Sequence, residues 1–165
     1  MSNSSVDAIQ TFDSPVTFTS RPRMVRAEQR VAWRLSALAL VLNRFNKKAA
    51  SIQHLHIVGW ALRSPRSRQA FLMFWEGKRT AGSLTDRFDP NLAVTLNLAL
   101  AHGLIDLHSA SRRVALTDDG AALASEIEGQ PDLLRDVKSF LNSLGDKLSD
   151  AKIEKTFAGP VRSDA

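Results

Sequence analysis

The stretch HGLIDLHSASRRVALTDDGAALAS, His102–Ser125, decides the fold class that this sequence predicts. Within it, Leu104–His108 and Arg113–Thr117 alternate apolar and polar residues, and the polar run SASR joins the two. This pattern is typical of a small β-hairpin. The LTDDG that follows offers Thr117 or Asp118 as the N-cap of a helix, so we expect the hairpin to lead directly into a helix.

Apolar residues at helical spacing predict further helices on both sides of the hairpin. Asp89 is a favourable N-cap and Pro90 a favourable first residue for the helix that precedes the hairpin, and Gly103 would end that helix. After Pro131, one long amphipathic helix is expected, with an apolar stripe that runs to Leu148. The expected helices span residues 30–45, 52–64, 67–77, 91–102, 119–129 and 133–148.

This order of elements, with helices before the hairpin and a capped helix after it, resembles that of a winged helix-turn-helix domain. We therefore expect a mainly α fold, in which a winged helix-turn-helix domain with a small β-hairpin wing carries an added C-terminal helix. The polar first residues predict a flexible tail at 1–20. The winged-helix domain is expected over 21–128, and the C-terminal amphipathic helix with its own tail over 129–165.

Composition excludes several classes of protein. The 165 residues include no cysteine, which excludes a disulfide framework, a Cys-ligated zinc site and a thiol nucleophile. The first residues lack the basic and apolar regions of a signal peptide, and the longest apolar run, Leu35–Leu42, is too short to span a bilayer. We therefore expect a cytoplasmic protein that does not contact a membrane.

No motif in the chain predicts an enzyme. The sequence has no P-loop, no dinucleotide fingerprint and no recognisable Ser/His/Asp arrangement. His54 and His56 are two residues apart on a helix, so their side chains point about 200° apart and cannot share a metal ion. We therefore expect no catalytic residue, no cofactor and no metal site.

Charge is unevenly distributed along the chain, whose net charge is +5. Residues 1–117 contain 16 Lys and Arg against 7 Asp and Glu, a net of +9, and residues 118–165 contain 6 against 10, a net of −4. The basic part would suit phosphate groups or an acidic protein surface. A solvated charged face is the alternative.

The helix before the hairpin would read DNA bases in many winged helices, yet here it contains no lysine or arginine. Its helical projection places Leu92, Ala93, Leu96, Ala99 and Leu100 on one face, and Asn91, Val94, Thr95, Leu98, Ala101 and His102 on the other. We expect the first face to be core.

An apolar centre with a polar edge suits a protein partner better than DNA, so we predict partner contacts at Val94, Leu98, Asn91 and Ala101. The alternative is that another segment of the same chain covers Val94 and Leu98.

Five arginines are candidates for contacts with nucleic-acid phosphates. Arg112 and Arg113 lie at or beside the turn of the expected hairpin, and Arg63, Arg66 and Arg68 surround Pro65. An arginine at such a turn is well placed for a phosphate or a minor groove. The alternative is a solvated hairpin and loop.

One further stretch, KKAASIQHLHIVGWALRSPRSRQAF (Lys47–Phe71), resembles the middle component of bacterial ABC three-component conflict systems, which are related to Lamassu-type phage defence. The resemblance covers about half of the chain. The residues that carry it are Ser51, Leu55-His56, Trp60-Ala61-Leu62-Arg63-Ser64, Asp89-Pro90 and Gly103-Leu104-Ile105.

This resemblance implies a non-enzymatic adaptor subunit of an antiphage defence complex, which docks an ABC or SMC-like ATPase to an effector subunit. The resemblance also implies a protein complex that contacts DNA non-specifically or not at all. Self-association of the chain is possible. The alternative is a DNA-binding winged-helix transcription regulator. The chemistry of the helix at 91–102 separates the two hypotheses.

Overall fold

The structure is a computed structural model that describes residues 30–79 and 88–157. In these residues the chain is mainly helical and contains one small three-stranded antiparallel sheet. The tail expected at 1–20 lies outside the described residues, as do residues 21–29. No helix in the described ranges is long and apolar enough to cross a membrane.

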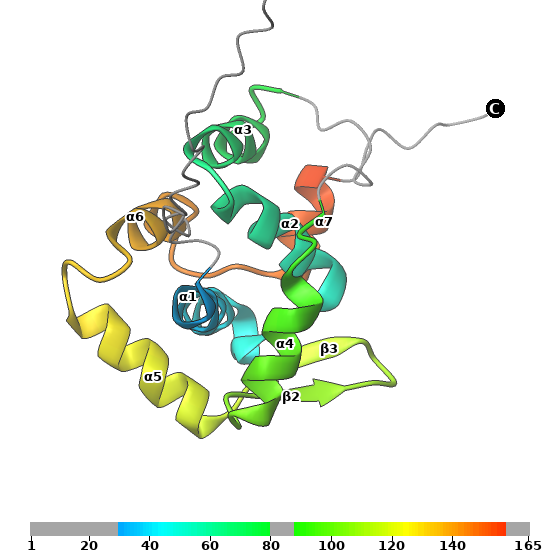
Figure 1. The fold of residues 1–165 in the computed structure, drawn as a ribbon. Coiled ribbons are helices and arrows are strands. Elements are labelled where there is room, and N and C mark those ends of the chain that lie inside the picture. Colours follow the sequence, from blue (N-terminus) through cyan, green and yellow to red (C-terminus); the bar gives the residue numbers. More distant parts are fainter. Residues whose placement is uncertain (1–29, 80–87, 158–165) are drawn as a thin grey trace, which may run out of the picture.

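Figure 1 shows the elements, which follow the chain in a simple order. The strands are β1 (Ala49–Ser51), β2 (Ile105–His108) and β3 (Arg113–Leu116), and a short 3-10 turn, η2 (Asn46–Lys48), precedes β1. The helices are α1 (Val31–Arg44), α2 (Ile52–Leu62), α3 (Pro65–Trp75), α4 (Leu92–Ala101), α5 (Asp118–Gly129), α6 (Arg135–Ser143) and α7 (Asp150–Phe157).

The predicted hairpin is present as β2 and β3, and the helix that the LTDDG predicts follows it as α5. The sheet has the order β1-β3-β2, so β3 lies in the centre, with Val114 opposite Ala50 on one side and Leu107 on the other. β1 is not predicted by the sequence, because three residues are too few to show an alternating pattern. Its pairing with β3 fixes the start of α2 beside the hairpin.

Local capping decides where several helices begin. Ser51 accepts a hydrogen bond from the backbone N–H of His54 and so caps α2 as the sequence predicts. Of the two candidates for α5, Thr117 is the cap. α4 begins at Leu92, two residues later than expected, with Asn91 as its N-cap residue, but the Asp89 side chain still accepts a hydrogen bond from the Asn91 backbone N–H at 3.0 Å at the start of the helix.

The prediction of one long C-terminal helix was also wrong, because the helix is interrupted at Gly145 and continues only as the separate helix α7. This glycine has a φ of +96°, a left-handed conformation that an α-helix cannot continue through. The side chain of Ser149 then accepts a hydrogen bond from the backbone of Lys152 and starts α7. Leu148 is hydrogen-bonded through its backbone to Arg44 and Asn46, which holds this segment against the end of α1.

A single cluster of buried apolar side chains connects the helices to the sheet. It includes residues of α6 and α7 as well as residues of α1 to α5, so the C-terminal helices share the same core. The domain boundaries expected at residues 20 and 128 stay predictions. The largest fully buried side chains are Phe71, Phe157, Leu40, Leu42, Leu55, Ile57, Leu141, Leu144, Leu148, Ile153, Val58 and Val114.

Candidate docking surface

The outward side of α4 is apolar or neutral along its whole length. We call its exposed residues the α4 surface: Ala93, Val94, Asn97, Leu100 and Ala101. Val94 is 60% exposed and Leu100 is 46% exposed, although both are aliphatic. The α4 surface therefore presents no charged group to solvent.

Part of the predicted division of α4 was wrong. Ala93 and Leu100, expected in the core, are exposed, and Thr95, expected outside, is buried. The physical reason is a pair of hydrogen bonds. Thr95 Oγ1 accepts from Arg34 Nη1 of α1 at 3.2 Å and donates to the Asn91 carbonyl at 2.9 Å. This partner lies 61 residues away in sequence, so the pattern of α4 alone could not reveal it.

The four predicted partner contacts do not all have the same exposure. Asn91, Val94 and Ala101 are exposed, whereas Leu98 is half-buried. Leu98 and Val94 line a shallow hollow between α4 and the start of α1, where Val31 forms part of the opposite wall. Leu98 is therefore a boundary residue that also supports the packing of α4 on α1.

Exposed large apolar side chains gather around α4. In the described ranges they are Val31, Phe88, Val94, Leu100, Leu107 and Leu133. Phe88 directly precedes α4, Leu107 lies on β2, which packs against α4, and Val31 lines the hollow beside it. Leu133 is the exception, on the segment between α5 and α6.

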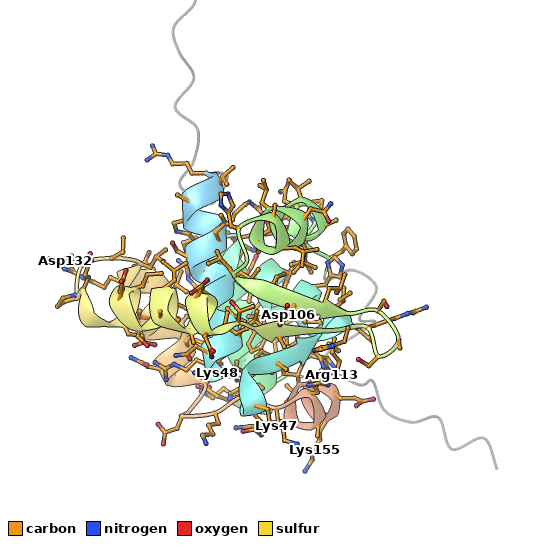
Figure 2. All side chains as sticks on the ribbon, turned by 90° about the horizontal axis from the view of Figure 1, so that it is seen from below. Lys47, Lys48, Asp106, Arg113, Asp132 and Lys155 are labelled. Atoms are coloured by element: carbon orange, nitrogen blue, oxygen red, sulfur yellow. The ribbon has the colours of Figure 1, made fainter. Side chains whose placement is uncertain are left out.

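The two hairpin arginines differ in their surroundings. Arg112 is exposed in the turn and has a φ of 51°. Arg113 lies on β3, where its guanidinium donates to the Asp150 carboxylate and, at 3.1 Å, to the Ala49 carbonyl. Arg113 is labelled in Figure 2. The structure therefore gives Arg113 a packing role and leaves Arg112 open to solvent.

The arginines near Pro65 are divided in the same way. Arg68 lies 3.5 Å from Asp136 of α6, and its side chain is largely buried. Arg63 and Arg66 are exposed at the junction of α2 and α3, and Arg63 Nη1 donates to the Phe88 carbonyl at 3.5 Å. These residues lie on different elements from Arg112.

A polar cluster that the sequence did not reveal joins α2, β1 and β3 to α7. His54 is buried, and its Nδ1 lies 2.7 Å from Asp150 Oδ1, which also accepts from the Ser51 backbone N–H at 3.2 Å. Arg113 donates to the other carboxylate oxygen. Because Asp150 is 96 residues from His54, no local spacing could indicate this contact.

The electrostatic state of Asp150 follows from these contacts. Burial alone would raise the pKa of its carboxyl group, but hydrogen bonds from His54, Ser51 and Arg113 outweigh burial and hold the pKa below its ordinary range. An ionised carboxylate can only accept hydrogen bonds, so Nδ1 of His54 carries the proton in this pair. Ser51 Oγ accepts a hydrogen bond from the backbone N–H of His54 and not from its ring. The contacts of this cluster therefore join α2, β1 and β3 to α7 and do not form a Ser–His pair of the catalytic type.

His56, the other histidine of α2, stacks on Phe88 with the ring centroids 4.1 Å apart. Burial lowers the pKa of His56 below its ordinary value, and the nearby Asp89 opposes that shift only partly. Its Nδ1 is buried and has no hydrogen-bond partner among the described residues. The described ranges hold no group of three His, Asp or Glu residues that could bind a metal ion.

Two features of the described residues are candidates for a functional role: the uncharged α4 surface, and the three of the five candidate arginines that are exposed, Arg63, Arg66 and Arg112. The α4 surface is continuous along one helix, whereas the arginines are dispersed over separate elements. The resemblance to the middle component of ABC three-component systems stays a prediction, since no family model, no curated protein and no solved structure matches this chain.

Proposed function

We propose that this chain is a non-enzymatic winged-helix adaptor that binds a partner protein through the α4 surface. The observation that carries the proposal is that this surface has no charged side chain, although Val94 and Leu100 are exposed there. Removing exposed apolar groups from water against a partner lowers the free energy and so favours binding. The centres of protein interfaces are correspondingly depleted in charge.

The order of elements supports the winged-helix part of the proposal. α4 directly precedes the β2–β3 hairpin, and β1 joins the same sheet on the other side of β3. In a winged helix, the helix before the hairpin is the one that enters the major groove when the domain binds DNA. α3 is then an additional helix between α2 and α4.

The composition of α4 argues against base reading. Sequence-specific readers place hydrogen-bonding side chains on base edges and cations near phosphates. Only Asn97 on the α4 surface and the exposed N-cap residue Asn91 offer side-chain amides that could pair with a base, and Val94 and Leu100 would lie unpartnered in a wet groove. A protein partner would cover these aliphatic side chains instead.

We propose further that the partners are the ABC or SMC-like ATPase subunit and the effector subunit of a cytoplasmic antiphage defence complex. The support for this step is the resemblance of Lys47–Phe71, Asp89-Pro90 and Gly103–Ile105 to the middle components of such systems. An adaptor needs surfaces for binding and no catalytic centre, which agrees with the absence of catalytic motifs in the sequence.

The test is recovery of the complex from native cells that express a tagged copy of the chain. We expect the ATPase subunit to co-purify with the wild type and with Leu133→Asp, and to be lost with Val94→Asp. Leu133→Asp is the matched control, because it places the same charge at another exposed apolar residue. Recovery with Val94→Asp at the wild-type level would contradict docking through the α4 surface.

Exposed Arg112 in the hairpin turn favours the second candidate, a DNA-binding transcription regulator. If Arg112 contacts a phosphate, Arg112→Ala should weaken DNA binding equally for all sequences and reduce its salt dependence by about one counterion. We expect any binding by the isolated chain to be weak and non-specific. A tight, sequence-specific footprint at physiological salt would replace the adaptor proposal with a regulator.

A further inference from the structure

We propose that a second site, in the hollow enclosed by α1, α2 and α4, binds an acidic segment of a partner protein. A small apolar side chain of that segment enters the hollow, and its carboxylates meet Arg34 and Arg63. This site lies on the other side of the Arg34–Thr95 hydrogen bond from the hollow beside Val94. It would give an adaptor its second binding surface, but it does not depend on the α4 surface.

The hollow has apolar walls and opens to solvent. α4 packs against both α1 and α2 around it (Figure 1). Gly59 lets Asp89 lie close to α2 at one side of the hollow, because a Cβ atom at this position would lie 2.9 Å from Asp89 Oδ2. Its apolar lining consists of Trp33, Ala37, Leu38, Val41, Leu55, Leu62 and Leu92.

Arg34 provides unused donors at the wall of this hollow. Its side chain is only 14% exposed, and Nη1 donates to Thr95 Oγ1 at 3.2 Å and lies 3.6 Å from Asp89 Oδ2. Among the described residues, no acceptor engages Nε or Nη2. A guanidinium pairs best with a planar carboxylate through two N–H groups, so a carboxylate is the ligand that these donors fit.

α1 and α2, which form most of the lining of the hollow, belong to a basic segment of the chain. The 46 residues of 30–75 contain no Asp or Glu, but they contain eight cations: Arg30, Arg34, Arg44, Lys47, Lys48, Arg63, Arg66 and Arg68. Acids of α5 and α6 pair with Arg44 and Arg68. Among the described residues, Asp89 is the one acid that lines the hollow, and Arg34 already faces it.

Two cations near the hollow have no acidic partner in the described ranges. Arg63 lines the hollow itself, and Arg30 is the exposed N-cap residue of α1, four positions before Arg34. A segment with an apolar anchor and flanking carboxylates complements both the walls and this rim. A nucleic-acid backbone would use the arginines but would leave the apolar walls in water.

The test begins with a phage-displayed library of random twelve-residue peptides, selected on the immobilised full-length chain. We expect enriched peptides to combine a small apolar residue, such as Ala or Val, with several Asp or Glu residues. Synthetic copies are then titrated by fluorescence anisotropy against the chain and its variants. Arg30→Glu with Arg63→Glu should weaken binding roughly tenfold or more, because rim charges next to the ligand are reversed.

The matched control is Lys47→Glu with Lys48→Glu, which changes the net charge equally. These lysines lie in η2 (Figure 2), beyond the other end of α1, whose 14 residues span about 21 Å. We expect the control to change the affinity by less than about twofold, because these exposed lysines do not line the hollow and salt screens charges that do not contact the ligand. Ala37→Leu, which narrows the hollow, should abolish peptide binding, and urea unfolding verifies that this variant is folded.

Several outcomes would overturn the inference. One is enrichment of peptides without an excess of Asp and Glu. Another is an equal loss of peptide affinity with the two charge-reversal pairs, which would indicate attraction by the net charge of the chain. If Val94→Asp abolishes peptide binding and Arg30→Glu with Arg63→Glu does not, the peptides bind the α4 surface. That result would contradict the second site and would leave the proposed function unaffected. If the Arg30 and Arg63 changes weaken only duplex DNA binding, the rim is a nucleic-acid surface.

Discussion

Thr95 shows how one hydroxyl group sets the orientation of a whole helix. A threonine in the middle of an aliphatic helix would be expected to face water, but here it is buried against Arg34. The Thr95 hydroxyl, together with Asp89 at 3.6 Å, gives the largely buried Arg34 guanidinium partners inside the fold, where an unpaired charge would be expensive. Leu100 is exposed as a consequence, and the α4 surface becomes more apolar than its helical projection predicts.

The difference between Val94 and Leu98 gives the first prediction. Val94→Asp should change the free energy of unfolding by less than about 0.5 kcal/mol, because the side chain is exposed. Leu98→Asp should cost about 1–3 kcal/mol, because the carboxylate would be half-buried between α4 and α1. Urea unfolding of the purified chain measures both. A loss of several kcal/mol with Val94→Asp would show that another part of the chain covers this face.

Asp150 gives a prediction that depends on pH. Its folded-state pKa is lowered, so its contribution to stability is fully present above its ordinary pKa near 3.9 and is lost as the pH falls through the lower, folded-state pKa. Asp150→Asn should therefore be less stable than the wild type at neutral pH, by about 1–3 kcal/mol for hydrogen bonds to a charged group. The difference should shrink below about pH 4.

Urea midpoints of the two proteins from neutral pH to about pH 2 test this prediction. Asp146→Asn is the control, since Asp146 is exposed and makes none of these contacts. A stability difference that stays constant through the acid range would mean that the shape of the Asp150 side chain matters and its charge does not.

The junction of β3 and α5 shows why the LTDDG sequence predicts its local structure so well. Thr117 Oγ1 accepts from the Gly120 backbone N–H and donates to the Gly103 carbonyl at 2.6 Å, so one side chain joins the end of α4 to the start of α5. A Cβ atom at Gly120 would lie only 2.1 Å from the Leu104 carbonyl oxygen. The glycine is required because the backbones approach so closely there.

Gly120→Ala should consequently destabilise the chain by about 3 kcal/mol or more, because the clash is with backbone that cannot move aside. Gly129→Ala is the matched control at the other end of α5, where a Cβ atom would meet nothing within 4 Å. It should be neutral or stabilising by about 1 kcal/mol, since alanine favours helix. Thermal and urea unfolding of both variants provide the comparison, and equal stabilities would contradict the close-approach argument.

The elements that sequence alone predicts are those whose causes are local. The hairpin, the Ser51 cap and the Thr117 cap each depend on residues within a few positions of one another. β1 and the start of α7 depend on distant partners, since β1 exists by pairing with β3 and Leu148 is held by Arg44 and Asn46. The apolar stripe in the sequence continues past Gly145, so the pattern did not indicate that the helix ends there.

The same limit applies to the candidate site. The uncharged character of α4 is visible in its sequence, but the burial of Thr95 and the pairing of Arg113 depend on contacts with α1 and α7. Two of the five candidate arginines, Arg68 and Arg113, prove to be occupied by acids of the C-terminal helices. Composition identifies cations, but only the packing shows which of them are free.

On the scale of the whole molecule, the acidic C-terminal part neutralises selected cations of the basic part. Glu128 pairs with Arg44 at 3.4 Å, Asp136 with Arg68 at 3.5 Å, and Asp150 with Arg113. These ion pairs add to the shared apolar core that packs α5, α6 and α7 against α1 to α3 and the sheet. The charge left over is positive and includes Arg63 beside the hollow, so the internal pairing determines where an acidic partner would bind.

α7 should therefore be required for the fold, although it is short and close to the end of the described residues. Leu148, Ile153 and Phe157 are almost fully buried, and each contributes roughly 1.5–3 kcal/mol by removal from water. Their sum is comparable to the total stability of a typical domain, about 5–15 kcal/mol. Phe157 also packs on Phe71 with ring centroids 4.8 Å apart, so its loss would open the aromatic part of the core.

Deletion of residues 146–165 should thus abolish cooperative unfolding and expose apolar surface, and deletion of residues 158–165 alone should leave the urea midpoint nearly unchanged. The first truncation removes the three buried anchors and the carboxylate that His54 and Arg113 share, which leaves two polar groups without their partner inside the body. The second leaves all of these contacts in place. Circular dichroism during urea titration, together with binding of an apolar dye, separates the two cases. A 146–165 deletion that unfolds cooperatively at the wild-type midpoint would show that α7 is an appendage and that α1 to α6 form a self-sufficient core.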